Sequence, residues 1–273
     1  MSVVEAEKKA GERKRGGGHK KLPGLTVKDG YTVHPFDTEF GVRTSGLIAG
    51  RHLRIGKGSD RHITAYYAVA PSVFDALLAR WRRAPYVAPL DQYTFLDLGA
   101  GMGRAMLLAS QHNFRQVVGV ELHSTLAEMA RKNMKLWRDA DRATAPMTVH
   151  CQDVLDFRFP DGPCVLFLFN PFGAAVLKKL LQKLAAEFAD RPRQLDLLYV
   201  NCEQDHVLEM QTGFCRFFQG PVRRSKKDAI ADFSIMANQP DGEYASTNYE
   251  DCSIWRWVGM GVNQTDASAG KAE

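Results

Sequence analysis

An acidic residue followed by three alternating glycines is the pattern in this chain that points most directly to chemistry. Asp97 ends a short apolar run, and Gly99, Gly101 and Gly103 follow it. Glycine lets the backbone approach a ligand closely, and the amides of such a turn suit a carboxylate or a phosphate. The Asp97 carboxylate would repel a pyrophosphate but would accept hydrogen bonds from the ammonium of an amino acid. The pattern predicts a site for a nucleotide-like cofactor; the alternative is a turn that serves only packing.

Two further acids end the next two apolar runs. Glu121 closes the run 116–121, and Asp153 closes the run 147–153. In a doubly wound sheet, a carboxylate at the tip of the second strand faces the ribose of a bound cofactor and binds its hydroxyls. The alternative for Asp153 is the turn-forming role that aspartate often has after a strand. Three acids at three successive strand ends favour one common binding site.

A sheet is needed to bring these acids together, and the apolar periodicity predicts one. Strands are expected at 94–97, 116–121, 147–153, 164–169, 194–201, 214–219 and 253–258, with helices at 71–81, 104–111, 124–138, 174–189 and 206–211. Alternation of strands and helices is typical of a parallel sheet. The predicted fold class is α/β: a doubly wound, mostly parallel seven-stranded sheet with helices on both faces, preceded by an N-terminal extension.

Two motifs resemble those of a known family. The segment Asp97–Gly103 resembles motif I, Asp-x-Gly-x-Gly-x-Gly, of the class I S-adenosylmethionine (SAM) methyltransferases. Asn170-Pro171-Phe172, after the fourth strand, resembles the Asn/Asp-Pro-Pro-aromatic motif of methyltransferases that act on amino nitrogens, with one proline in place of two. The single-proline form resembles a bacterial group of class I methyltransferases of unassigned substrate and, more distantly, the non-SET protein-lysine methyltransferases. The resemblance implies a seventh strand that returns antiparallel between the fifth and the sixth.

The resemblance also implies a set of site residues. The cofactor-binding positions would be Tyr67, Asp97, Gly99, Ala100, Gly101, Gly103, Glu121, Leu122, Asp153, Val154 and Asn170. On the acceptor side, Asn170 would orient an amine and Phe172 would wall the pocket and contact a cation. Asn170-Pro171-Phe172 is equally a good strand-ending turn, with asparagine as a helix cap. Tyr67 lies where related families carry Tyr-x-Pro-Ser/Thr, but Val69 and Ala70 occupy the last two positions here.

The function expected from these patterns is SAM-dependent methyl transfer to an amino nitrogen of a protein side chain or a small molecule. Alignment of nucleophile and methyl in a water-poor pocket suffices for such a reaction if the amine is neutral. A hydride-transferring dehydrogenase would need the spacing Gly-x-Gly-x-x-Gly, which the glycine turn lacks. The remaining alternative is a non-catalytic SAM-binding or RNA-binding module.

Composition shifts divide the chain into four parts. Residues 1–21 carry seven Lys or Arg side chains against three Glu and few apolar residues, which predicts a disordered basic tail. Nucleic acid is a possible but not favoured partner of this tail, since such segments are more often solvated extensions. Residues 22–90 would form an N-terminal extension with a cap helix, residues 91–260 the SAM-binding domain, and residues 261–273 a flexible tail.

Two segments have no role that the sequence reveals. Residues 35–46 are rich in turn formers and aromatic side chains. The hydrophilic stretch 221–250 contains the basic side chains Arg223, Arg224, Lys226 and Lys227. The expected role of this stretch is a solvated loop; the alternative is selection of an acidic partner near the substrate mouth.

Composition bounds the remaining possibilities. Apolar residues make up 45% and charged residues 25%, which is ordinary for a globular protein. The five cysteines form no Cys-x-x-Cys pair, and the eight histidines have no ligand spacing, so reduced thiols, a cytoplasmic location and no metal are expected. No run of about 18 apolar residues is present, so a membrane partner is not expected.

Overall fold

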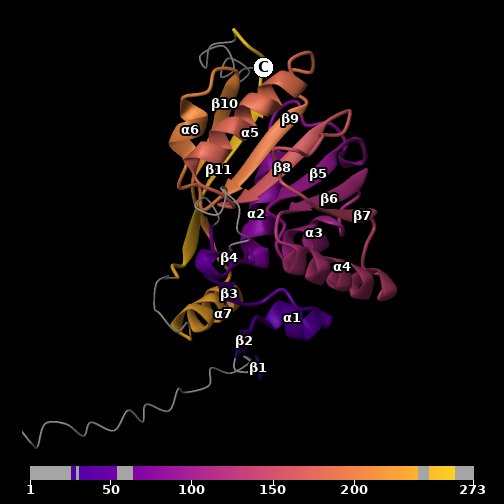
Figure 1. Ribbon diagram of the computed structural model, residues 1–273, viewed down its shortest axis with the longest axis vertical. Helices are drawn as coiled ribbons and strands as arrows, with labels where there is room; N and C mark the ends of the chain where they lie inside the picture. Colours follow the sequence, from indigo (N-terminus) through magenta and orange to yellow (C-terminus); the bar gives the residue numbers. More distant parts are fainter. Residues whose placement is uncertain (1–25, 29–30, 54–63, 239–245, 262–273) are drawn as a thin grey trace, which may run out of the picture.

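The computed structural model describes residues 26–28, 31–53, 64–238 and 246–261. The predicted tail 1–21 and all but the first residue of the predicted tail 261–273 lie outside the described residues. The elements in chain order are β1 (Thr26–Lys28), β2 (Tyr31–Val33), α1 (Pro35–Phe40), β3 (Leu47–Ile48), β4 (Tyr66–Tyr67), α2 (Pro71–Arg82), β5 (Thr94–Leu98), α3 (Arg104–Ala109), β6 (Gln116–Glu121), α4 (Ser124–Asp139), β7 (Met147–Cys151), β8 (Cys164–Phe169), α5 (Ala174–Glu187), β9 (Leu195–Val200), α6 (Asp205–Glu209), β10 (Phe214–Arg223), α7 (Lys226–Ala237) and β11 (Tyr249–Trp257) (Figure 1). Short 3-10 helices cover Gly50–His52 and Leu90–Gln92.

A seven-stranded sheet with the order β10-β11-β9-β8-β5-β6-β7 forms the centre of the molecule. Strands β5 to β9 run parallel, and β11 lies antiparallel between β9 and β10. The predicted fold class and the predicted antiparallel seventh strand are confirmed. The chain leaves β5 toward one edge through β6 and β7, and then returns to place β8 on the other side of β5. The order therefore reverses between β5 and β8, and a crevice outside the carboxyl ends of such strands is the usual ligand site.

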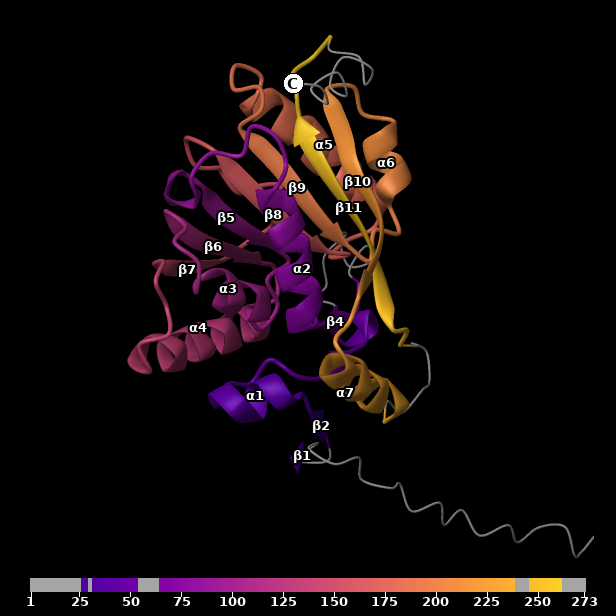
Figure 2. The ribbon, with the colours of Figure 1, turned by 180° about the vertical axis from the view of Figure 1, so that it is seen from behind.

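Helices cover both faces of the sheet, with α2, α3 and α4 on one face and α5 on the other (Figures 1 and 2). Phe74 of α2 and Phe95 of β5 belong to the core of the first face, whereas Leu96 of β5 and Leu180 of α5 belong to the core of the second. Phe95 and Leu96 face opposite cores because successive side chains of a strand alternate. Every residue of β5 is buried, as expected for a central parallel strand covered on both sides.

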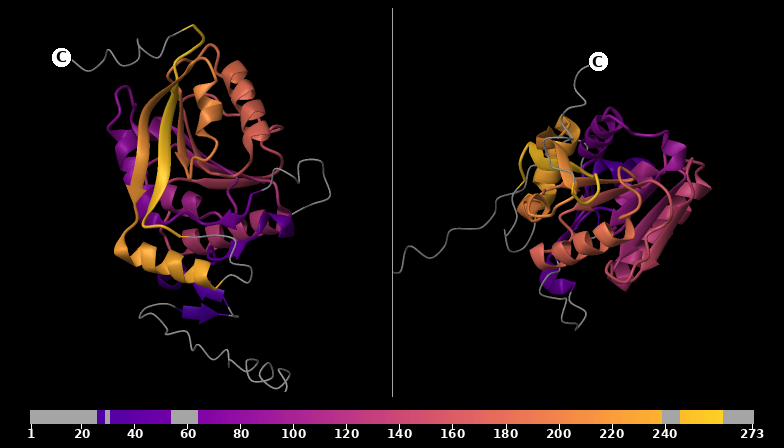
Figure 3. Two further views of the ribbon diagram at one scale, coloured as in Figure 1. Left: turned by 90° about the vertical axis from the view of Figure 1, so that its left-hand side faces the viewer. Right: turned by 90° about the horizontal axis from the view of Figure 1, so that it is seen from above.

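The N-terminal segment and the insertion between β10 and β11 pack together at the carboxyl end of the sheet (Figures 1 and 2). Strand β11 pairs with β9 only over Cys252–Arg256, but its pairing with β10 continues to Tyr249. The two strands thus extend beyond the sheet as a ribbon that leads into α7 (Figure 3). Helix α7 packs against β2 and α1, and Asn238 donates to the Thr32 hydroxyl over 2.8 Å. We call α7 and residues 31–45 together the cap.

The stretch 221–250 is not the solvated loop that its composition suggests. It contains the end of β10, all of α7 and the start of β11. Arg224 is buried, with its Nε 2.7 Å from Oδ2 of Asp232, and its guanidinium also pairs with Glu250. The expectation of a loop is wrong because these charges compensate one another inside the cap, which composition cannot reveal. Within the described residues, no helix combines the length and the apolar character that a membrane span requires.

Candidate functional site

The glycine turn after β5 lies where the strand order reverses. Gly99, Gly101 and Gly103 have φ angles of +81°, +54° and +88°, which residues with side chains rarely adopt. A Cβ atom on Gly101 would lie 2.2 Å from the ring of Tyr66, and one on Gly99 would lie 2.5 Å from Cβ of Pro171. Glycine is therefore required at these two positions both by the backbone and by packing. Gly103 has a different role, because it is the cap residue that precedes α3.

Glu121, at the tip of β6, is tied to the glycine turn. Its Oε2 accepts a hydrogen bond from the Gly101 amide over 2.7 Å, and its Oε1 accepts one from the His123 amide over 2.7 Å. The side chain is buried, and burial raises its pKa, an effect that the two backbone amides oppose. Each oxygen keeps a second lone pair. The carboxylate can thus hold the turn and bind two further donors.

Asp97 and Arg104 line a small pocket beside the glycine turn. Burial and, as a smaller cause, the nearby Glu121 carboxylate together raise the pKa of Asp97 to about 8. Arg104 is also buried; its Nε donates to the Thr44 hydroxyl over 2.7 Å, and its Nη2 lies 3.6 Å from a carboxylate oxygen of Asp37. An acid and a guanidinium that line one cavity complement a ligand with both an amino and a carboxylate group.

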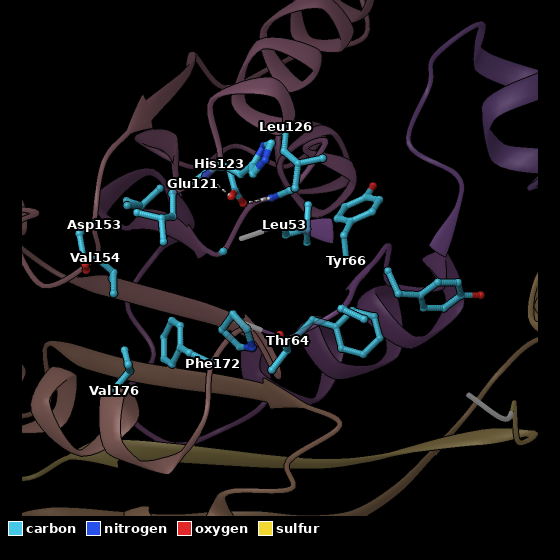
Figure 4. A pocket seen from close by; sticks show the side chains of 18 of the residues that line it. Leu53, Thr64, Tyr66, Glu121, His123, Leu126, Asp153, Val154, Phe172 and Val176 are labelled. Carbon is cyan, nitrogen blue, oxygen red and sulfur yellow. Dashed lines mark hydrogen bonds between the residues drawn. The ribbon is translucent and has the colours of Figure 1, made fainter. Parts of the chain in front are cut away.

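A larger pocket of about 130 Å³ adjoins the small one and lies against the tips of the central strands (Figure 4). Of the predicted residues, Tyr67, Gly99, Gly101, Glu121, Leu122, Asp153, Val154 and Phe172 line it, Asp97 and Ala100 line only the small pocket, and Gly103 and Asn170 line neither. Oδ1 of Asp153 accepts a hydrogen bond from the Leu155 amide over 2.9 Å. Asp153 therefore forms the turn after β7 and also faces the larger pocket.

The Asn170-Pro171-Phe172 segment follows β8 and borders the larger pocket through its last two residues. Asn170 has a φ angle of +40°. Its backbone oxygen accepts a hydrogen bond from the Thr64 hydroxyl over 2.8 Å, and its side-chain Oδ1 accepts one from the Tyr199 hydroxyl over 3.3 Å. The residue after β8 is therefore held by a segment before β5 and by the neighbouring strand β9.

Tyr67 contributes its ring to both pockets and directs its hydroxyl to the cap. The ring packs edge-to-face against Phe169, with 6.3 Å between the ring centroids. The hydroxyl donates to Oδ1 of Asp232 in α7. Burial, followed by the Asp232 carboxylate, raises the pKa of Tyr67, so this hydroxyl stays protonated at neutral pH. Tyr67 therefore connects the pocket wall to the helix of the insertion.

Sequence reasoning missed several residues of the larger pocket: Leu53, Thr64, Ala65, Tyr66, His123, Leu126, Gln152, Phe169 and Val176. His123 and Leu126 lie in the turn and the first helical residues after Glu121, so their closeness to a predicted acid was a usable signal. Among the described residues, Nδ1 of His123 is buried without a hydrogen-bond partner. Leu53 and Thr64 belong to a segment without a motif, and only the fold places them here.

Comparisons with known proteins assign this chain to no family. No family model matches the chain, and no curated protein matches it either. Similar solved structures include an RNA methyltransferase from Salinibacter ruber in complex with S-adenosyl-L-homocysteine (18% identity, TM-score 0.41, covering 72% of this chain and 95% of that one). Another is the [4+2]-cyclase SpnF (13% identity, TM-score 0.49, covering 70% of this chain and 82% of that one). A third is the ribosomal protein L11 methylase from Lactobacillus delbrueckii subsp. bulgaricus (13% identity, TM-score 0.41, covering 67% of this chain and 77% of that one). One fold supports many activities, so the function must be argued from the site itself.

Proposed function

We propose that this chain binds SAM and transfers its methyl group to an amino nitrogen of a protein side chain or a small molecule. The observation that carries the proposal is the order of polar groups along the two adjoining pockets. Asp97 is the next-to-last residue of β5, Glu121 ends β6 and Asp153 follows β7, and these strands are neighbours in that order. SAM has a matching order of groups: an amino acid, a ribose with two hydroxyls, and an adenine with an amino group.

The residues present fit such a ligand. The ammonium would bind Asp97 and the carboxylate would bind Arg104 in the small pocket. The ribose hydroxyls would donate to the remaining lone pairs of Glu121, and the adenine amino group would donate to Asp153. Leu122, Val154 and Leu126 would supply apolar contacts with the adenine ring. Gly99 and Gly101 line the larger pocket, so their backbone can lie close to the ligand.

The chemistry that SAM supplies is an electrophilic methyl group on a sulfonium leaving group. The task of the protein is then to align the acceptor and to exclude water. Tyr67, Phe169 and Phe172 supply aromatic walls, and Asn170 supplies two oxygens that can accept the hydrogens of an amine. A neutral amine needs no general base for this displacement.

The first test is binding, followed by transfer. Calorimetric titration should detect SAM and S-adenosylhomocysteine (SAH), but not NAD, which would bind if the chain were a dehydrogenase. Radiolabelled SAM should then methylate a component of a protein extract or a metabolite pool. Binding of SAM without transfer to protein, metabolite or nucleic-acid pools would favour the non-catalytic module. Label in nucleic acid would contradict the acceptor class proposed here.

Asn170→Ala tests the acceptor side of the proposal. If Asn170 orients an amine, the variant should keep its SAM affinity and lose most of its transfer rate, because misplacement of the acceptor affects the chemical step. The N-cap of α5 is Gly173, so the expectation that Asn170 caps this helix is wrong. If Asn170 serves only in the strand-ending turn, the variant should lose about 0.5–1.5 kcal/mol of folding free energy, the net contribution of its hydrogen bond with Tyr199, with unchanged turnover. Turnover and thermal unfolding, both measured on the same preparation of the variant, distinguish these two roles of Asn170.

A further inference from the structure

The residue after β8 is fixed more firmly than a strand-ending turn requires. Asn170 has a left-handed backbone, φ +40°, which costs energy in a residue with a side chain. The Thr64 hydroxyl holds its backbone oxygen, and the Tyr199 hydroxyl holds its side-chain oxygen. Pro171 packs so closely on Gly99 that a Cβ there would lie 2.5 Å from Cβ of Pro171. Three independent parts of the chain thus determine one strained residue.

The hydrogen bonds around Tyr199 set the direction of the Asn170 amide. The Gln204 amide donates to the Tyr199 hydroxyl oxygen over 3.4 Å. The hydroxyl hydrogen of Tyr199 therefore remains available for Oδ1 of Asn170, 3.3 Å away. Tyr199 is 1% exposed, and burial raises its pKa, so it remains a neutral donor at physiological pH. The side-chain oxygen of Asn170 is consequently directed toward β9 and its amide nitrogen away from it.

Asn201, at the tip of β9, adopts a left-handed backbone without two long-range hydrogen bonds to its oxygens. The left-handed conformation of Asn170 therefore does not by itself require the bonds from Thr64 and Tyr199. It has a φ angle of +48°, close to that of Asn170. Its side-chain amide donates to Oε1 of Glu203 over 3.2 Å, and Glu203 is exposed. The two asparagines follow neighbouring parallel strands, so they share a local geometry. Only Asn170 is held through both of its oxygens by residues distant in sequence.

We propose that Tyr199 and Thr64 are positioning residues for methyl transfer. Neither hydroxyl needs to touch SAM. Each occupies one lone pair of an Asn170 oxygen and leaves a second lone pair on Oδ1 and on the backbone oxygen, to which the two hydrogens of an acceptor amino group would donate. This inference rests on the proposed function and deepens it: it assigns the control of amine geometry to two hydroxyls that no motif contains.

Sinefungin provides a test that does not require the natural acceptor. This SAM analogue carries a primary amine at the position of the transferable methyl group, whereas SAH carries nothing there. The ratio of SAH to sinefungin dissociation constants therefore reports how well the acceptor side receives an amine. In the wild-type protein sinefungin should bind about fivefold or more tightly than SAH, the effect of one or two net hydrogen bonds.

Two substitutions remove one hydroxyl each. Tyr199→Phe should leave SAH binding within about twofold and lower the sinefungin preference about three- to tenfold, which corresponds to one hydrogen bond. Thr64 lines the larger pocket, so Thr64→Val is judged by the ratio of the two dissociation constants alone, which should fall by a similar factor. Asn170→Ala should abolish the preference, and Tyr199→Phe added to Asn170→Ala should have no further effect, because the hydroxyl acts only through Asn170. The Thr64 variant, at a partly exposed position, provides the test if the buried Tyr199 variant is poorly folded.

The controls are Tyr93→Phe, a buried tyrosine just before β5 at the opposite end of the strand, and Asn201→Ala. Both should keep the wild-type ratio. An unchanged ratio in Tyr199→Phe and Thr64→Val would overturn the inference while SAH binding left the proposed function standing. Equal losses of SAH and sinefungin affinity would also overturn it, since they indicate general damage to the site. Failure of the wild-type protein to bind SAH would overturn the proposed function and this inference together.

Discussion

Glu121 illustrates how one residue can organise a loop and still serve a ligand. Its two oxygens accept hydrogen bonds from the amides of Gly101, in the turn after β5, and of His123, two residues beyond Glu121 itself. The sequence indicates an acid at this position but not that the acid also holds the glycine turn. The glycine turn and the proposed ribose site therefore share a single carboxylate.

Glu121→Ala should weaken SAH binding by about 1–3 kcal/mol, because charge-assisted hydrogen bonds to the ribose are lost and the turn loses an anchor. Calorimetric titration measures the change. Glu128→Ala, on the exposed side of α4 beside Lys132, is the matched control and should bind normally. A folded Glu121→Ala variant with the wild-type dissociation constant would contradict the placement of the ribose.

Asp97 should make cofactor binding depend on pH. Its pKa is raised from 3.8 to about 8 by burial and by Glu121. Between about pH 4 and pH 8 the folded protein holds a proton there that the unfolded chain has lost. This carboxyl therefore lowers stability as pH rises through that window, with the full loss above the folded pKa. Binding of an ammonium favours the ionised carboxyl, so SAH affinity should rise toward pH 8 as binding releases a proton.

Titration at pH 7 in buffers of different ionisation enthalpy measures the released proton. Asp97→Asn should remove the contribution of this carboxyl, while the titration of the ligand itself is common to both proteins. Because Asp97 and Glu121 interact, the proton belongs to the pair and not to one residue. Equal proton release by the wild-type and Asp97→Asn proteins would show that Asp97 does not contact the ammonium.

At the scale of elements, α7 is the part of the fold that carries the buried charges of the cap. Asp228 and Asp232 point inward, whereas Phe233 is 63% exposed. The inward acids have partners: Asp232 pairs with Arg224, and Asp228 accepts the Ser72 amide over 2.9 Å. Helix α7 therefore packs through a face that mixes these acids with the buried apolar residues Ala231 and Ile235, so its sequence lacks a purely apolar stripe.

Arg224→Met should lower the free energy of unfolding by about 3–5 kcal/mol, because it leaves Asp232 buried without its cation. Lys227→Met is the control, since the Lys227–Glu39 pair is more than half exposed and should contribute less than about 1 kcal/mol. Chemical denaturation of both variants measures the difference. Similar small losses in the two proteins would mean that the Arg224 network does not stabilise the cap.

At the scale of the whole molecule, the sheet could be predicted and the cap could not. The strands and helices of residues 94–200 follow from local apolar periodicity, and the acids at Asp97 and Glu121 mark strand ends that any parallel sheet brings together. The hydrogen bond from Tyr67 to Asp232 joins residues 165 positions apart, and the one from Thr64 to Asn170 joins residues 106 apart. Composition and periodicity contain no information about such pairs, which arise only when the fold is complete.

The cap is joined to the core of the sheet domain more tightly than an appended extension would be. The ring of Phe36 stacks on Trp137 of α4 with centroids 5.7 Å apart. Asn133 of α4 exchanges hydrogen bonds of 2.9 Å and 2.7 Å with the backbone of Arg43. Arg104, directly after the glycine turn, donates to the Thr44 hydroxyl. The segment before β3 thus shares apolar packing and polar pairing with residues far along the chain, and one of these, Arg104, lines the small pocket.

Two truncations test this dependence. Removal of residues 1–21 should leave the melting temperature and SAH binding unchanged, as expected for the predicted disordered tail. Removal of residues 1–46 exposes Trp137 and takes away the Arg43 partner of Asn133 Oδ1 and the Thr44 partner of Arg104 Nε. Lost burial of about 1.5–3 kcal/mol for each large apolar side chain and about 1–3 kcal/mol for each orphaned polar group amounts to much of the total stability of an ordinary domain. The shorter chain should therefore fail to unfold cooperatively, or melt at least 10 °C lower by an order-of-magnitude estimate, and lose SAH binding. If it melts and binds like the full chain, the N-terminal segment is an independent extension and the Arg104 contacts are dispensable.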